Sequence, residues 1–115
     1  MRKIFFVVAA STVVAVIASI ASCSGSIPEP TPSQSVWASD KWPGTTYETL
    51  VHGRELYIAK CSGCHSLHAP SEYSERRWSA IVDTMKFKAK LNDSEAVLIT
   101  KYLASAAQNN LSSSR

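Results

Sequence analysis

Two cysteines and two histidines lie close together in the stretch "KCSGCHSLH", residues 60–68 of this 115-residue chain. Side chains of these types can hold a metal ion, form a redox-active disulfide or attach a haem covalently. Each of these three chemistries requires its own spacing and its own surrounding elements. The spacing of Cys61, Cys64, His65 and His68 therefore decides what kind of site the chain carries.

A zinc site uses four ligands, and the four side chains of this stretch can be counted as such a set. All of them fall in one short loop, however, which is too tight to close a tetrahedron around the ion, and the sequence has no second Cys/His pair. A thiol–disulfide enzyme places Cys-x-x-Cys at a helix N-terminus beside a βαβ pattern. Here the pair follows a predicted helix and no strand pattern is present, so both chemistries are disfavoured.

The order Cys61-x-x-Cys64-His65 is typical of covalent attachment of haem c. Two thiols at this spacing add across the two vinyl groups on one edge of the porphyrin. The histidine that follows is then carried under the ring, where its Nε2 can bind the iron. Ser62 and Gly63 are small and do not crowd the ring edge. The sequence therefore predicts one covalently bound haem c, with His65 as an iron ligand.

Residues 1–22 have the features of a bacterial export signal. Arg2 and Lys3 give a short positive start, and an uncharged run rich in Val, Ala and Ile follows. The run ends in "IASC", residues 20–23, which resembles a lipobox, in which the cysteine is acylated and becomes the first mature residue. Acyl chains on Cys23 would anchor the protein to a membrane. A cleaved signal without lipid and an uncleaved membrane helix are the alternatives.

An exported protein of this kind is expected on the periplasmic side, and Ser24 after the cysteine favours the outer membrane over the inner membrane or the soluble periplasm. Residues 23–115 keep ten of the twelve Lys and Arg and all nine Asp and Glu, which leaves a net charge of +1. A nucleic-acid-binding protein would cluster many more basic residues. The composition therefore excludes nucleic acid as a partner.

The remaining chain divides into three segments. Residues 23–45 hold four of the five prolines among Ser, Thr and Gly, which predicts a lipidated, unstructured tether. Trp37 and Trp42 within it are expected to dock on the domain, on a partner or at the membrane interface. Residues 46–107 form the predicted domain, whose size is marginal for an unaided core. Residues 108–115 are a polar tail that frays.

The domain is predicted to be all-α, because no period-2 alternation long enough for a strand is present. The first helix covers 46–60, with Gly53 and Tyr57 on one face. The second begins at the N-cap Ser74, and the third begins at Asn92, with a glutamate at capping-box spacing. The apolar stripes at helical period are Trp78, Ile81, Val82 and Met85 in the second helix, and Ile99, Tyr102, Leu103 and Ala106 in the third.

The stretches "GRELYIAKCSGCH" and "WSAIVDTMKFKAKLNDSEAVLITKYL" resemble the small monohaem class I c-type cytochromes. Most similar in layout, over residues 53–103, are the short cytochrome subunits of bacterial dehydrogenases such as sulfite dehydrogenase. The resemblance implies a cytochrome c-like helical domain around one covalent haem. It also implies an electron carrier that is not itself an enzyme, with a dehydrogenase or an oxidase as its redox partner.

Met85 is the only methionine left once Met1 departs with the signal, and the resemblance implies that it binds the iron opposite His65. A methionine ligand raises the reduction potential and suits electron transfer. By periodicity alone, Met85 is a core residue beside Ile81 and Val82, so both interpretations stay open. A vacant sixth position would instead indicate a haem-based sensor or a small-ligand-binding haem protein.

Several neighbouring residues have secondary roles. His68 is expected to remain in the loop on the same side of the ring as His65, and His52 to lie at the surface or rim. A backbone carbonyl near Pro70 would accept the Nδ1–H of the iron-binding histidine, or the proline would only form a turn. Candidate partners of the haem propionates are Arg76, Arg77 and Trp78, and a basic patch that could steer an acidic redox partner comprises Lys86, Lys88 and Lys90.

Overall fold

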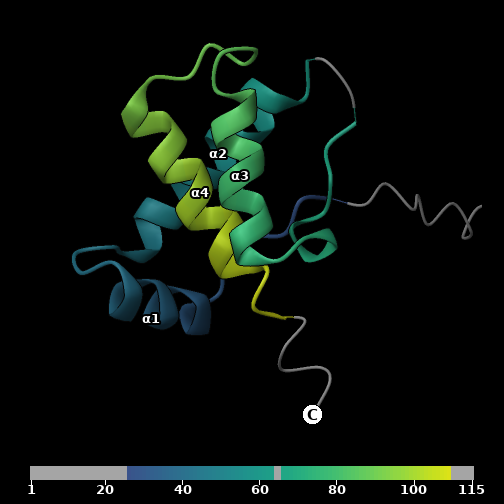
Figure 1. The fold of residues 1–115 in the computed structure, drawn as a ribbon. Coiled ribbons are helices and arrows are strands. Elements are labelled where there is room, and N and C mark those ends of the chain that lie inside the picture. Colours follow the sequence, from purple (N-terminus) through teal and green to yellow (C-terminus); the bar gives the residue numbers. More distant parts are fainter. Residues whose placement is uncertain (1–25, 64–65, 110–115) are drawn as a thin grey trace, which may run out of the picture.

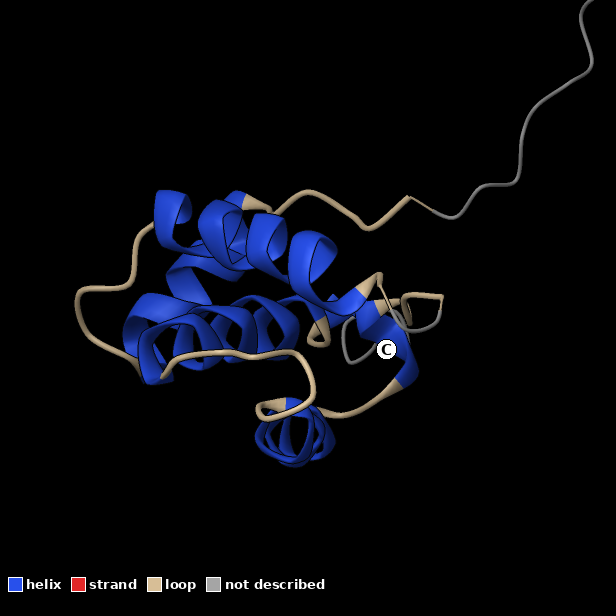
Figure 2. Ribbon diagram, turned by 90° about the horizontal axis from the view of Figure 1, so that it is seen from above, coloured by secondary structure: helices blue, strands red, loops and turns tan. Residues whose placement is uncertain are grey.

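The computed structural model describes residues 26–63 and 66–109, and within these ranges the chain forms helices and loops without strands (Figures 1 and 2). The predicted all-α fold is therefore confirmed. In chain order the elements are α1 (Pro32–Lys41), α2 (Tyr47–Cys61), the short 3-10 helix η1 (Pro70–Glu72), α3 (Glu75–Met85) and α4 (Asp93–Ala106). None of these helices is long and apolar enough to span a bilayer.

Polar caps fix the starts of the helices that surround the site. The Oγ of Ser74 accepts a hydrogen bond from the backbone N–H of Arg77 at 3.3 Å, at the start of α3. Asn92 and Glu95 form a reciprocal capping box at the start of α4, with distances of 2.9 and 3.0 Å. These side chains satisfy N–H groups that have no partner inside the helix. The predicted starts at Ser74 and Asn92 are confirmed.

Helices α2 and α4 form the main packing contact of the domain and cross at Gly53. A Cβ built on Gly53 would lie 2.2 Å from the carbonyl oxygen of Leu98 and 2.9 Å from the Cβ of Tyr102, so no larger residue fits at this crossing. Tyr57, one turn further along α2, is buried against Tyr102, with ring centroids 6.5 Å apart. The predicted shared face of Gly53 and Tyr57 is thus confirmed.

The apolar stripes of α3 and α4 face the interior as predicted. Their buried members are Trp78, Val82, Ile99, Tyr102, Leu103 and Ala106. Ile81 and Met85 are only half-buried, because both line the cavity described below. The part of the α3 stripe nearest the C-terminus of that helix therefore borders open space and is not enclosed in close-packed core.

The prediction of an unstructured tether over residues 23–45 is wrong for residues 32–41. These residues form α1, which packs on α4 and α2 through Gln34, 3% exposed, and Ala38, fully buried. Thr31 caps the helix in a capping box with Gln34, and Pro32 occupies the first helical turn, where its fixed φ is compatible with a helix. The prolines therefore start a helix here. Cys23 lies outside the described residues.

The two tryptophans of this region pack against each other. Trp37 and Trp42 meet edge to face, with ring centroids 5.6 Å apart. The ammonium group of Lys41 lies 5.4 and 5.5 Å from the two ring centroids, within the range of cation–π attraction. Lys41 also forms an ion pair with Glu75 at the start of α3. The C-terminal end of α1 is thereby tied to the domain.

Candidate haem-binding site

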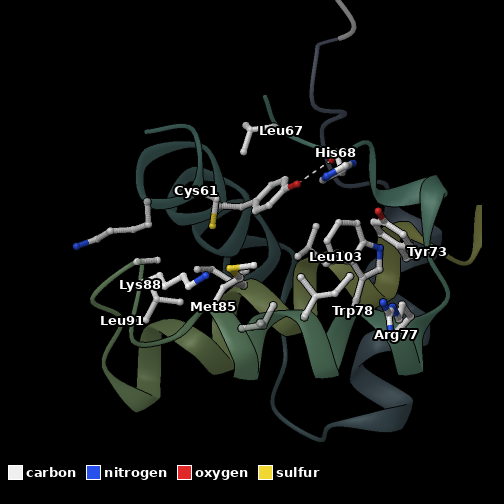
Figure 3. Close-up of a pocket in the computed structure, with 16 residues that line it drawn as sticks. Cys61, Leu67, His68, Tyr73, Arg77, Trp78, Met85, Lys88, Leu91 and Leu103 are labelled. Atoms are coloured by element: carbon white, nitrogen blue, oxygen red, sulfur yellow. Dashed lines mark hydrogen bonds between the residues drawn. The ribbon is translucent and has the colours of Figure 1, made fainter. Parts of the chain in front are cut away.

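A cavity of about 340 Å³ opens beside the C-terminal ends of α2 and α3 (Figure 3). Its volume falls in the range of roughly 300–1,000 Å³ that is usual for small-molecule sites. The walls are mainly apolar, and exposed basic side chains from α2, α3 and the loop after α3 border it. The apolar lining includes Leu67, Ile81, Val82, Leu91, Ile99 and Leu103, and the basic residues are Lys60, Arg77 and Lys88.

The cavity brings together two sulfur-bearing side chains singled out in the sequence. Cys61 is the last residue of α2, Met85 is the last residue of α3, and both are half-buried in the cavity wall. Figure 3 shows their sulfur atoms directed into the same space. Cys64 and His65 lie outside the described residues, so the roles predicted for them remain predictions.

The described residues fit a haem. A porphyrin requires apolar walls, and the cavity supplies branched aliphatic side chains together with Tyr57 and Trp78. Covalent attachment requires a thiol at the wall, which Cys61 provides, and a thioether such as that of Met85 is an established iron ligand. The haem propionates carry negative charge, and Arg77 and Lys88 at the border of the cavity provide compensating positive charge.

Two aromatic side chains hold the loop that follows the haem motif. The hydroxyl of Tyr57 on α2 donates to the backbone carbonyl of His68 at 2.8 Å, as Figure 3 shows. The indole Nε1–H of Trp78 on α3 donates to the carbonyl of Pro70 at 2.8 Å, in a buried position. The loop is therefore tied to both walls of the cavity, which fixes its path between the motif and η1.

The hydrogen bond of Trp78 shows that one predicted partner of the haem propionates is wrong. An indole ring has a single N–H donor, and in Trp78 the Pro70 carbonyl accepts it. Trp78 therefore has no donor left for a propionate. Of the other two candidates, Arg77 lines the cavity and Arg76 lies outside its lining. The bond expected between His65 and a backbone carbonyl near Pro70 stays a prediction, because His65 lies outside the described residues.

Burial changes the acidity of the two tyrosines between α2 and α4. Burial, with a smaller contribution from the nearby Cys61, raises the pKa of Tyr57 to about 12. Burial also raises the pKa of Tyr102, whose hydroxyl donates to the carbonyl of Pro28 at 2.6 Å. Both hydroxyl groups therefore stay protonated, and can act as donors, over the whole physiological pH range.

The two histidines outside the motif have different surroundings. His52 is exposed on α2, as predicted. His68 is half-buried at the cavity, where its Nδ1 lies 2.6 Å from an Oε atom of Glu72 and its ring packs against Tyr73 at 5.4 Å. Hydrogen bonds from the Ala69 backbone N–H and from His68 lower the pKa of Glu72. His68 is thus held in the loop by a carboxylate.

The predicted basic patch is smaller than expected, because Lys86 is half-buried and forms an ion pair with Asp93. Lys88 and Lys90 are exposed, and of these two Lys88 lines the cavity. Lys60 also lines the cavity and was not predicted to do so. Tyr57, Lys60 and Cys61 follow a spacing of i, i+3 and i+4, which places all three on one face of α2 and would have indicated this residue.

Comparisons with known proteins find one similarity. No family model matches the chain, and no solved structure matches it. Over 58 residues, half of this chain, the sequence is 29% identical to the "Cytochrome c-type protein TorY" of Haemophilus influenzae (strain ATCC 51907 / DSM 11121 / KW20 / Rd). The matched part is 16% of that protein, so the chain spans only a small fraction of its length. This similarity supports the c-type cytochrome character indicated by the Cys-x-x-Cys-His motif.

Proposed function

We propose that this protein is an exported c-type cytochrome that carries one covalently bound haem and transfers electrons, without catalysing a reaction of its own. The observation that carries the proposal is the placement of Cys61 and Met85, whose sulfur atoms point into one apolar cavity next to the haem motif. The similarity to a c-type cytochrome supports the same conclusion. When bound, haem c supplies one-electron chemistry at its iron.

The residues of the chain have separate parts in this function. Cys61 and Cys64 would form the thioether bonds, and His65 and Met85 would bind the iron. The apolar walls exclude water, which together with the methionine ligand sets the reduction potential. The hydrogen bonds from Tyr57 and Trp78 hold the loop after the motif in place, so the segment that follows His65 has a defined path.

Exposed positive charge around the cavity favours a negatively charged redox partner. Arg77 and Lys88 border the cavity and are exposed, whereas Lys60, also at the border, pairs with the carboxylate of Glu95 at 3.6 Å and contributes less free charge. Complementary charge accelerates the encounter of two proteins and orients them before contact. We therefore propose that a dehydrogenase or an oxidase with an acidic surface approaches this side of the molecule.

The proposed location follows from the N-terminal sequence. Residues 1–22 would direct export, and acylation of Cys23 would anchor the protein on the periplasmic side of a membrane. Ser24 favours the outer membrane, with the inner membrane and the soluble periplasm as alternatives. Because the mature chain is nearly neutral, we expect no nucleic-acid partner.

The haem is tested by maturing the full chain with its export machinery and recording the mass and the pyridine haemochrome spectrum. We expect the mass of the processed chain plus one haem and the spectrum of a haem with two thioether bonds. The Cys61→Ala variant should give the spectrum of a single thioether bond or lose the haem. A colourless wild-type protein would refute the proposal.

The iron ligand is tested by Met85→Ala, with Ile81→Ala as a control because Ile81 lies one turn earlier in the same cavity wall. We expect the wild type and Ile81→Ala to show the red-edge absorption band of methionine-bound ferric haem. Met85→Ala should lose this band and, when reduced, bind carbon monoxide. If the wild type lacks the band and binds carbon monoxide readily, the sixth position is open and a sensor is the better assignment.

A further inference from the structure

The chain a few residues after Cys23, the predicted acylation site, is docked on the helical domain. We call residues 26–31 the strap; Figure 1 shows it in dark blue, leading into α1. The guanidinium of Arg54 on α2 donates to the carbonyl of Ile27 at 2.8 and 3.0 Å and to that of Pro28 at 3.1 Å. It also pairs with the carboxylate of Glu29 at 2.9 Å. One side chain thus binds three consecutive residues of the strap.

A second helix holds the strap as well. The hydroxyl of Tyr102 on α4 donates to the carbonyl of Pro28 at 2.6 Å. Ile27 packs against the hydrophobic core, and Pro30 is buried. The side chain of Arg54 is only 19% exposed, which makes its charge-assisted bonds stronger than those of a surface pair. The folded unit therefore begins at Ile27, four positions after Cys23.

We propose that the strap holds the domain directly against the lipid surface in which Cys23 is anchored; this inference rests on the proposed acylation of Cys23. Four residues of extended chain reach at most about 14 Å. An unstructured tether as far as Thr45 would have a root-mean-square length of about 25 Å and a maximum of about 75 Å. The docked strap removes most of this reach, so the redox partner must come to the membrane surface.

The composition of the strap suits a position next to lipid. Between Cys23 and Ser39 the only charged residue is Glu29. Because Glu29 pairs with Arg54, this part of the chain presents no uncompensated negative charge to anionic headgroups. The strap can therefore lie at the headgroup level with neither charge repulsion nor the cost of desolvating an unpaired charge.

The clamp itself is tested without the membrane, on the haem-loaded soluble variant Cys23→Ser. NMR relaxation order parameters of the backbone of residues 26–31 are compared between this protein and its Arg54→Ala and Tyr102→Phe derivatives. Arg76→Ala is the matched control, because Arg76 is an exposed arginine of α3 outside the strap contacts. We expect the strap order parameters to fall from a rigid value of about 0.85 to below about 0.6 in Arg54→Ala, to fall less in Tyr102→Phe, and to stay unchanged in Arg76→Ala. Equal strap order in Arg54→Ala and Arg76→Ala would overturn the clamp.

The position at the membrane is tested with the acylated full chain on supported bilayers that contain anionic lipid. Neutron reflectometry measures the height of the protein layer. We expect the wild-type and Arg76→Ala layers to touch the headgroups and the Arg54→Ala layer to lie further out and be more diffuse. Equal heights for all three proteins would overturn the inference. A mass without acyl groups would also overturn it. If the strap is nevertheless rigid in the soluble protein, the contacts of Arg54 and Tyr102 with the strap are right and the acylation of Cys23 is wrong.

Discussion

The hydroxyl of Tyr57 offers a sharp test of how the loop after the haem motif is held. The Tyr57→Phe substitution removes one oxygen atom and leaves the ring, which is 4% exposed and packs against Trp78 at 6.0 Å. The change therefore isolates the 2.8 Å hydrogen bond to the carbonyl of His68. Losing this bond leaves a partly buried acceptor without its donor, which costs about 1–2 kcal/mol of folding free energy. For a domain of this size, that corresponds to a decrease in Tm of roughly 5–15 °C.

The assay is thermal and denaturant unfolding of the haem-loaded protein, with Tyr47→Phe as the control. Tyr47 lies on the same helix and is 40% exposed, so its variant should stay within about 0.5 kcal/mol of the wild type. A second measurement reads the loop directly, because the hyperfine-shifted NMR signals of the haem methyl groups depend on the orientation of the iron ligands. We expect these signals to move in Tyr57→Phe and to stay in place in Tyr47→Phe. Equal stability and equal spectra in both variants would refute the positioning role.

Two further predictions concern the α2–α4 crossing and its tyrosines. Gly53→Ala should lower the free energy of unfolding by about 1–3 kcal/mol, because its Cβ would lie 2.2 Å from the Leu98 carbonyl oxygen of α4. Denaturant unfolding measures this change, and a variant as stable as the wild type would contradict the crossing. Burial holds the pKa of Tyr57 at about 12, and that of Tyr102 also above the ordinary 10, so the folded state keeps protons that the unfolded state releases. The contribution of the two tyrosines to stability should therefore be constant below pH 10 and fall as the pH rises from about 10 to 12, and a denaturation midpoint that stays flat across this interval would contradict the assignment.

The parts of the structure that the sequence predicted correctly depend on local patterns. The caps Ser74 and Asn92 mark helix starts because a side-chain oxygen must satisfy nearby N–H groups, and this requirement involves only the next few residues. The shared face of Gly53 and Tyr57 follows from helical period alone. Met85 lies at a cavity, and its binding to iron remains a prediction.

The parts that the sequence did not predict depend on contacts between distant segments. The proline-rich composition of residues 23–45 indicated disorder, but a proline in the first turn is compatible with a helix, and α1 is stabilised by packing on α4. The bond from Tyr102 to Pro28 joins residues 74 positions apart. The indole N–H of Trp78 donates to the carbonyl of Pro70. This pairing depends on how η1 lies against α3 and not on a sequence pattern.

Three aromatic residues of the core share one arrangement that explains how so small a domain keeps irregular segments in place. Tyr57, Trp78 and Tyr102 bury their rings in the same cluster, and each gives its only donor to a backbone carbonyl of a non-helical segment or of η1. Each residue thus contributes apolar area to the core and a hydrogen bond at its edge. The loop after the motif and the strap are consequently fixed by contacts within the chain itself.

The cavity wall differs from these segments because its residues are only partly covered by the chain. Cys61, Ile81 and Met85 are half-buried around an open volume, so an apolar group that fills the volume would remove their remaining exposed surface from water. A group that binds the folded state and not the unfolded state raises the free energy of unfolding. The helical frame and its loop ties are therefore built by the chain, and the proposed haem would close the core at the ends of α2 and α3.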